Sequence, residues 1–199
     1  SISNSNLIVV NASDNCYLIK NSDSKTIQDH GEYDPHIWLS LKNAKIEAQD
    51  IKDALIKADP SNKAYYESNY SNFEKQLDGL YEEYKTKLES VGTKHFVTGH
   101  AAFAYLCNDF NLQQSSVENV FAEGEPTPQK MQSLIEYCKK NNVKTIFMEE
   151  LASPKVSETL AQEIGGKVKK IYTVESKEDN MDYLQSMKAN LESIYESLK

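Results

Sequence analysis

The sequence predicts an α/β fold whose C-terminal part holds a four-stranded, mostly parallel sheet flanked by helices. Two observations lead to this prediction. After Gly92 the chain alternates four times between a short apolar run and an amphipathic run, a pattern typical of a parallel sheet covered on both faces. Before Gly92, apolar residues recur at steps of three or four over some thirty residues, which predicts a helix of roughly 45 Å.

Composition limits the classes of function. The chain has 199 residues, of which 39% are hydrophobic and 26% charged, an ordinary mix for a protein that buries a core. The net charge of -8 and the lack of a basic stripe exclude a nucleic-acid-binding surface. No apolar run approaches the length of a membrane span, and we expect no signal peptide within these residues. This length allows one or two domains.

The N-terminal part contains three expected elements. Residues 6–13 form a β-branched run that predicts a buried strand, and the polar residues 15–36 predict a long loop. Ser40 is a good N-cap for a helix over residues 40–59. The apolar positions of that helix fall on one face: Leu41, Ala44, Ala48, Ile51 and Leu55.

The long helix begins at Asp59-Pro60. Its apolar stripe comprises Tyr66, Tyr70, Phe73, Leu77, Leu80, Tyr84 and Leu88. A rod of this length suits an element that joins two lobes rather than one inside a small domain. We therefore expect three parts: an N-terminal lobe remainder at residues 1–58, a linking helix at 59–92 and a C-terminal α/β lobe at 93–199.

In the C-terminal part, local signals mark four strands and four helices. Strands are expected at residues 94–98, 115–120, 143–148 and 167–172, and helices at 99–110, 127–142, 153–166 and 180–198. Thr127 with Pro128 and Ser153 with Pro154 are helix-starting pairs. Gly165 marks a helix end.

Polar residues that can bind a metal follow several of these strands. His100 follows the first strand, Glu149-Glu150 the third and Glu175 the fourth. In parallel sheets, ligands bind beyond the carboxyl ends of the strands. His36 lies at a loop-to-helix junction from which a facing lobe can present it. Two histidines and a carboxylate from separate segments favour a metal site over a catalytic triad.

The segments "YDPHIWLS" (33–40) and "VTGHAAFAYLC" (97–107) closely resemble the solute-binding proteins of bacterial ABC importers for zinc and manganese. These metal-binding lipoproteins were once labelled adhesins. "GEPTP", "FMEELASPKVSETLA" and "YTVES" fit later family segments, so the resemblance runs from about residue 6 to the C-terminus. It implies two lobes joined by a rigid helix, with the metal held between them by His36, His100 and Glu175. It also implies delivery to a membrane permease and an extracytoplasmic location, as a cell-surface lipoprotein or in the periplasm.

The chain departs from the family pattern in two places. The family has a further ligand histidine in the first half of its N-terminal lobe, and this chain is expected to begin after that point. An incomplete lobe would leave a sheet edge exposed, and we expect that self-association can occur there. The His-rich loop of zinc-type members shrinks to "IQDHGEY". His30 is then either a residue that captures metal loosely or a solvated loop residue.

The resemblance favours Zn²⁺, with Mn²⁺ as the alternative. Manganese members usually place a glutamate where this chain has His100, and imidazole suits zinc. Three nitrogens and a carboxylate would form a closed tetrahedral site, which binds and carries but leaves no position for activating water. A zinc-dependent hydrolase that uses Glu149 or Glu150 as general base is the other alternative. The chain lacks an HExxH motif, so we expect no enzyme.

Several residues keep two interpretations. Asp34 either orients a ring nitrogen of His36 or accepts a hydrogen bond within the turn. Glu149 either hydrogen-bonds a ligand or is a charge at the cleft edge. His95 is expected to be partly buried and structural. The three cysteines are expected to be small buried residues, although Cys107 and Cys138 are able to form a disulfide in an extracellular protein.

Overall fold

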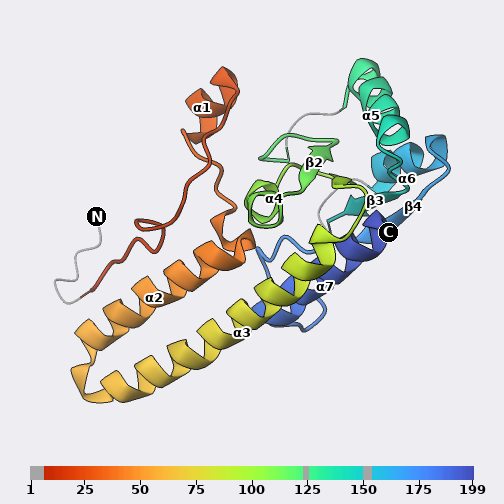
Figure 1. The fold of residues 1–199 in the computed structure, drawn as a ribbon. Coiled ribbons are helices and arrows are strands. Elements are labelled where there is room, and N and C mark those ends of the chain that lie inside the picture. Colours follow the sequence, from red (N-terminus) through yellow and green to blue (C-terminus); the bar gives the residue numbers. More distant parts are fainter. Residues whose placement is uncertain (1–6, 123–125, 150–153) are drawn as a thin grey trace.

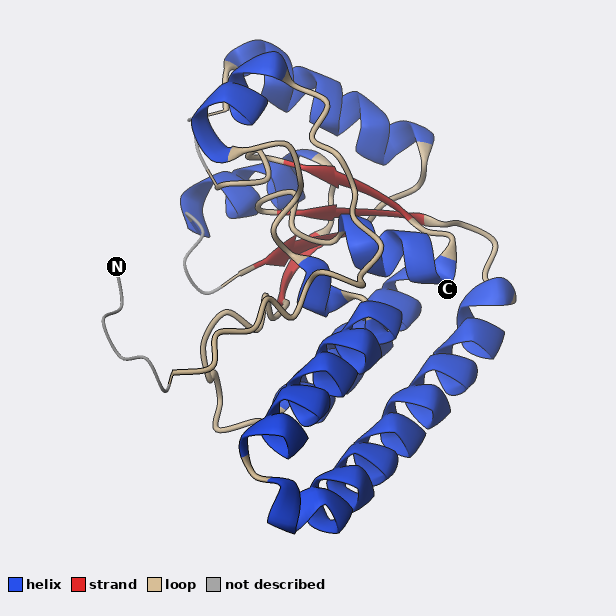
Figure 2. Cartoon of the chain, turned by 90° about the vertical axis from the view of Figure 1, so that its left-hand side faces the viewer, coloured by secondary structure: helices blue, strands red, loops and turns tan. Residues whose placement is uncertain are grey.

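The computed structural model describes residues 7–122, 126–149 and 154–199. Within these ranges, helices cover both faces of a small sheet, and two long helices extend away from it side by side (Figures 1 and 2). In the described ranges, no helix combines the length and the apolar character needed to cross a membrane.

The sheet is parallel throughout. Its strands are β1 (His95–Thr98), β2 (Gln113–Ser116), β3 (Thr145–Met148) and β4 (Lys167–Lys170), in the order β2-β1-β3-β4. Thr98 at the end of β1 pairs with Ser116 of β2 and with Phe147 of β3. The carboxyl ends of the strands therefore meet at one edge. The predicted four-stranded sheet and its helical cover are confirmed.

Alternate strand residues enter two separate cores. Phe96 and Phe147 belong to the larger cluster, whereas the adjacent Val97 and Ile146 belong to the smaller one. This follows from the alternation of side chains along a strand. Cys107 is buried in the larger core and Cys138 in the smaller. They are free thiols, because the sheet separates the two clusters.

Four helices accompany the strands. They are α4 (Ala104–Phe110), α5 (Pro128–Lys140), α6 (Pro154–Glu163) and α7 (Tyr183–Leu198). Thr127 caps α5 by accepting a hydrogen bond from the Lys130 backbone N–H at 3.2 Å, as predicted. The predicted cap of α6, Ser153, lies outside the described residues. α7 starts with a reciprocal capping box between Asp182 and Gln185.

The two long helices are α2 (Leu41–Ala58) and α3 (Lys63–Glu89), connected by a 3₁₀ turn, η2 (Pro60–Asn62). The Ser40 hydroxyl accepts from the Asn43 N–H at 3.0 Å and donates to the Asp109 carboxylate of α4 at 2.8 Å. This cap therefore also ties α2 to the α/β layer. The C-terminal half of α3 supplies four buried residues to the larger core: Leu77, Leu80, Tyr84 and Leu88.

The N-terminal prediction was wrong in two respects. Residues 7–13 form no strand, and Val9 is 75% exposed. A strand needs a neighbour for its backbone hydrogen bonds, and the described residues place none beside this run. The expected loop at 15–36 contains a short helix, α1 (Ser24–His30), capped by Asp23, which accepts from the Thr26 N–H at 2.7 Å. The sequence pattern did not predict α1 because its seven residues carry no apolar stripe.

Two further boundaries differ from the prediction. The helix expected at 99–110 begins only at Ala104, because residues 99–103 form a turn in which the Thr98 hydroxyl donates to the His100 carbonyl at 2.6 Å. The strand expected at 115–120 lies at 113–116 instead. Its start is polar, and it is the pairing with β1, not the apolar pattern, that makes it a strand.

Candidate metal centre

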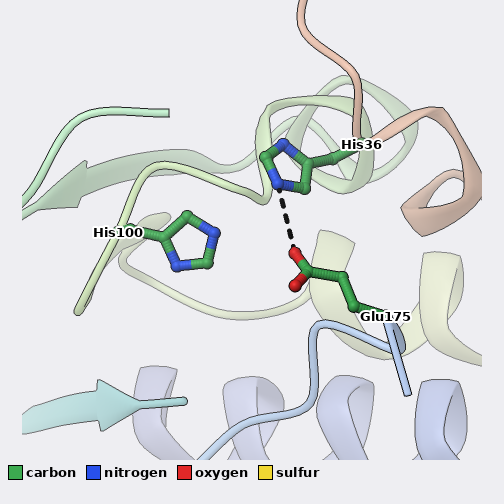
Figure 3. A group of neighbouring side chains, drawn as sticks. All are labelled: His36, His100 and Glu175. Carbon is green, nitrogen blue, oxygen red and sulfur yellow. Dashed lines mark ion pairs between the residues drawn. The ribbon is translucent and has the colours of Figure 1, made fainter. Parts of the chain in front are cut away.

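A cavity of about 500 Å³ opens at the carboxyl edge of the sheet. His36, His100 and Glu175 line it, and each offers one ligand atom within 4.8 Å of the others (Figure 3). The three residues come from the segment before α2, the turn after β1 and the loop after β4. The structure thus brings together all three residues that the sequence proposed as ligands.

His36 is held by the residues that precede it. The Asp34 carboxylate accepts from the His36 backbone N–H at 2.9 Å, and the same oxygen lies 2.8 Å from His36 Nδ1. Asp34 is itself fixed, since its carbonyl accepts from the Tyr105 hydroxyl at 2.8 Å. Both Asp34 and His36 are buried. Because Nδ1 has this acceptor, Nε2 remains for a metal, and it lies 3.6 Å from the Glu175 carboxylate.

His100 is buried and has a carboxylate of its own. Its backbone N–H donates to Glu149 Oε1 at 3.3 Å, and its Nδ1 lies 3.5 Å from that oxygen. Burial lowers the pKa of His100, but the hydrogen bond and charge of Glu149, together with the charges of Glu175 and Glu118, leave this pKa above its ordinary value. The ring centroids of His100 and His36 are 5.4 Å apart.

Glu149 is a buried carboxylate at the end of β3. Its Oε1 is engaged by His100, whereas its Oε2 is buried and has no hydrogen-bond partner among the described residues. Such an atom costs free energy in a protein interior, and a nearby cation would lower that cost. Glu150, the other candidate base, lies outside the described residues.

Glu175 differs from the two histidines because its side chain is 42% exposed. It occupies the loop between β4 and α7, which starts directly after the sheet. An exposed carboxylate beside two buried imidazoles can enter or leave a metal site with little repacking. Glu175 is therefore the most exposed of the three candidate ligands.

His30 and His95 lie apart from the group of three. The His30 ring stacks on Phe121, with centroids 4.0 Å apart, and Phe121 lines the cavity. His30 thus contacts the rim and does not line the cavity. His95 Nδ1 lies 2.9 Å from the Tyr137 hydroxyl, in the partly buried structural role that we expected.

Sequence reasoning missed Glu118. Its backbone N–H donates to the Gly99 carbonyl at 2.8 Å, which continues the β1–β2 ladder. Burial raises the pKa of Glu118, the charge of His100 lowers it and that of Glu149 raises it, so these three groups interact electrostatically. No local motif marks Glu118, because its place depends on the parallel pairing of two strands.

The donors suit a borderline-soft cation. Two imidazole nitrogens and one carboxylate are ligands that zinc accepts, with bonds of about 2.0–2.2 Å. Donors around a tetrahedral zinc ion lie about 3.4 Å apart. The candidate ligand atoms lie within 4.8 Å of one another, so the longest distances between them have to shorten when zinc binds. Three protein donors leave one position open.

Comparisons with known proteins agree with this chemistry. A family model described as zinc-uptake complex component A, periplasmic (ZnuA), matches residues 1–197. A protein of Treponema pallidum (strain Nichols) that is assigned to metal binding is 47% identical over 167 residues, which cover 83% of this chain and 53% of that protein. The high-affinity zinc uptake system protein ZnuA of Bacillus subtilis (strain 168) is 39% identical over 170 residues, with the same coverage of each chain.

A solved structure is also similar. The Zn(II)-bound structure of a variant of AdcAII from Streptococcus pneumoniae aligns with a TM-score of 0.84 at 34% identity, and covers 96% of this chain and 70% of that one. The chain spans about half the length of the two curated relatives described above.

Proposed function

The chain belongs to the ZnuA family of periplasmic zinc-uptake components, and from this membership we propose that it binds Zn²⁺ as cargo through His36, His100 and Glu175. The observation that carries the proposal is the arrangement of the two imidazoles. Each is buried, each has a buried carboxylate at Nδ1, and both approach one cavity that also holds Glu175.

Asp34 and Glu149 support this role without binding the metal. A carboxylate that accepts the Nδ1 hydrogen fixes the tautomer and orients the ring. Asp34 does this for His36 and Glu149 for His100. The unpartnered oxygen of Glu149 adds negative potential to the cavity, which favours a divalent cation.

The protein carries the ion and does not use it in catalysis. Glu149, the candidate general base, accepts from the His100 backbone N–H through Oε1, which favours a role in orienting His100 over one in activating water. Delivery of zinc to the membrane permease of an ABC importer, outside the cytoplasm, completes the proposal. It is supported by the family and by the names of the zinc-uptake relatives.

The test is a titration of the chain with Zn²⁺ against a competing chelator, with a parallel titration of Mn²⁺. We expect one zinc per chain and weaker binding of manganese, since imidazole favours zinc. Tighter binding of manganese would favour the alternative cargo. Zinc-dependent ester or peptide hydrolysis by the loaded protein would contradict the carrier role.

The apolar run at residues 7–10 supports a proposal about assembly, namely that two copies associate through it. Its four side chains are exposed, and its backbone is in no strand. An exposed apolar run with no strand partner among the described residues can pair with a second chain. Sedimentation should show a dimer that Val9→Lys dissociates, and a monomer at all concentrations would contradict this proposal.

A further inference from the structure

Trp38 connects the two segments that carry His36 and Glu175. We propose that Trp38 is a positioning residue that holds Glu175 against His36 and acts on metal binding through Glu175. This inference rests on the proposed function, because it concerns the same site. It adds the residue that sets the geometry of the most exposed candidate ligand.

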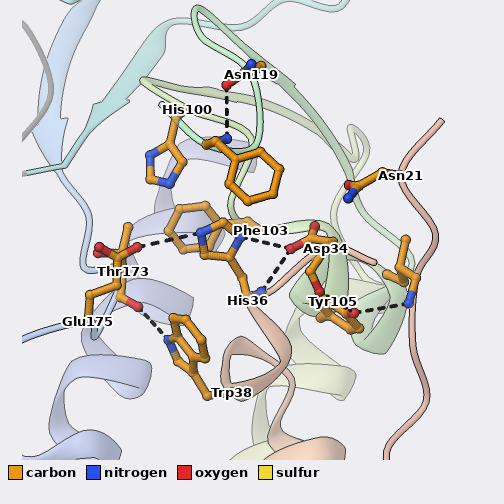
Figure 4. A network of polar contacts seen from close by, with 12 residues as sticks. Asn21, Asp34, His36, Trp38, His100, Phe103, Tyr105, Asn119, Thr173 and Glu175 are labelled. Carbon is orange, nitrogen blue, oxygen red and sulfur yellow. Dashed lines mark hydrogen bonds and ion pairs between the residues drawn. The ribbon is translucent and has the colours of Figure 1, made fainter. Parts of the chain in front are cut away.

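The first contact is at the start of the Glu175 loop. Trp38 Nε1 donates to the Thr173 carbonyl at 2.8 Å (Figure 4). Trp38 lies two positions after His36, and Thr173 lies two positions before Glu175. One hydrogen bond between residues 135 positions apart therefore sets the spacing of the two candidate ligands.

The second contact is at the end of the same loop. The Tyr183 hydroxyl donates to the Trp38 carbonyl at 2.7 Å, and Tyr183 is the first residue of α7. The Tyr183 ring also packs edge-on against Phe73 of α3, with centroids 6.1 Å apart. Trp38 thus bonds to both ends of the loop, through its ring and through its backbone.

The frame before the loop is rigid. Asn190 of α7 fixes Tyr172 with two hydrogen bonds, one from the Tyr172 N–H at 2.9 Å and one to the Tyr172 carbonyl at 2.7 Å. Thr173 follows directly and is buried. The bond from Trp38 therefore joins the His36 segment to a fixed point of the α/β layer.

The backbone next to Glu175 is strained. Val174 has a φ of 59°, which β-branched residues rarely adopt. Val174 packs against the larger core, and Glu175 lies at the cavity. A loop in this conformation needs outside contacts to keep it, and Trp38 supplies them on the side of His36.

Another anchor of the loop lies farther from Glu175 along the chain. Lys170 Nζ lies 2.9 Å from the Asp179 carboxylate and 3.3 Å from that of Glu178. Lys170 and Asp179 are both partly exposed, so their ion pair contributes little in water, whereas the Glu178 carboxylate is buried. This anchor contacts the loop three or more residues after Glu175, whereas the bond from Trp38 contacts Thr173, two residues before Glu175.

A test has to separate positioning from contact with His36. The Trp38 ring is tilted against the His36 ring, with centroids 5.6 Å apart, so loss of the ring would also disturb His36. Trp38→Phe keeps an aromatic ring and removes the Nε1 donor. A double-mutant cycle with Glu175→Ala then shows whether the effect passes through Glu175.

Zinc affinity is measured by chelator competition for wild type, Trp38→Phe, Glu175→Ala and the double variant. We expect Trp38→Phe to weaken zinc binding about tenfold in wild type, as for other partners that orient a ligand. In the Glu175→Ala background the same change should have less than about a twofold effect. An equal loss in both backgrounds would overturn the proposal.

Cobalt(II) absorption provides the second readout, because it reports the ligand geometry. Trp38→Phe and Tyr183→Phe should both change the visible bands of the cobalt-loaded protein, while Tyr137→Phe, which removes the hydroxyl near His95, should not. If Trp38→Phe does not fold, Tyr183→Phe takes its place in the cycle. A wild type that binds no zinc would contradict the proposed function, whereas binding with an additive cycle would contradict only the role of Trp38.

Discussion

At the scale of single residues, each candidate ligand histidine has a buried carboxylate behind it, but the two pairs differ. Asp34 lies 2.8 Å from His36 Nδ1, whereas Glu149 lies 3.5 Å from His100 Nδ1. His36 is therefore held more tightly than His100 before metal arrives. The side chains that move to bring the donor atoms closer together around zinc are therefore mainly those of His100 and Glu175.

His100→Ala should weaken zinc binding by roughly 100-fold or more, because loss of a partner behind a ligand already costs about 10- to 100-fold. Isothermal titration calorimetry measures the change. His95→Ala is the matched control, since His95 contacts Tyr137 away from the cavity, and it should bind zinc as wild type does. Unchanged binding by His100→Ala would remove His100 from the ligand set.

A second residue-scale prediction concerns Glu47 of α2, where burial raises the pKa to about 7 from the ordinary 4.5. The folded state holds this proton more tightly than the unfolded state, so stability falls as pH rises from about 4.5 to 7. Glu47→Gln has no carboxyl to titrate and so removes this fall in stability. Urea unfolding should show the variant gaining stability over wild type between pH 5 and pH 8.

The control for Glu47 is Glu158→Gln at an exposed position of α6. Its difference from wild type should be the same at both pH values. A Glu47→Gln difference that does not change with pH would show that this carboxyl does not titrate over that range.

At the scale of elements, the helical pair is unequally packed. The C-terminal half of α3 is buried in the larger core, but Ile51 of α2 is 49% exposed and Tyr65 of α3 is 64% exposed. Packing therefore stabilises one end of the pair. Elsewhere along α3, intrinsic helix propensity has a greater share in stability.

Gly79 and Gly166 provide a matched pair of glycine substitutions. Gly79 is exposed within α3, and a Cβ there meets nothing within 4 Å, so Gly79→Ala should stabilise the protein by about 0.5–1 kcal/mol. At Gly166 a Cβ would come within 2.5 Å of the Lys144 carbonyl. Gly166→Ala should therefore destabilise the protein by about 1–3 kcal/mol.

Urea unfolding of both glycine variants measures these changes. The opposite signs are the essential result. A Gly166→Ala protein as stable as wild type would mean that the turn before β4 can move away from Lys144.

At the scale of the whole molecule, the site joins parts of the chain that lie far apart in the sequence. His36 precedes the helical pair, and His100 and Glu175 follow strands of the sheet. A metal bound by all three adds a connection across the molecule, next to the hydrogen bond between Trp38 and Thr173. Binding should therefore stabilise the native state as a unit.

Zinc should raise the melting temperature. At a free zinc concentration of 100 times Kd the stabilisation is about 2.7 kcal/mol, which corresponds to roughly 5–10 °C for a chain of this size. Calorimetry with zinc and then with excess EDTA measures the shift and its reversal. The double variant His36→Ala, His100→Ala should show no shift, and a shift that persists in it would place the zinc elsewhere.

The sequence alone determined most of the local elements and the identity of the candidate ligands. The caps at Ser40 and Thr127 act on donors within three residues, so local pattern is sufficient to place α2 and α5. The apolar runs of β1 and β3 are visible for the same reason. His36, His100 and Glu175 were found from their positions at element ends and from the resemblance to a family.

Only the tertiary structure decided which distant segments meet. It made a strand of the polar residues 113–116 by pairing them with β1, and it left the apolar run at 7–10 exposed because no strand lies beside it among the described residues. It placed Glu118 near His100 and joined Trp38 to Thr173. These contacts depend on strand order and register across many residues, and periodicity within one segment carries no information about them.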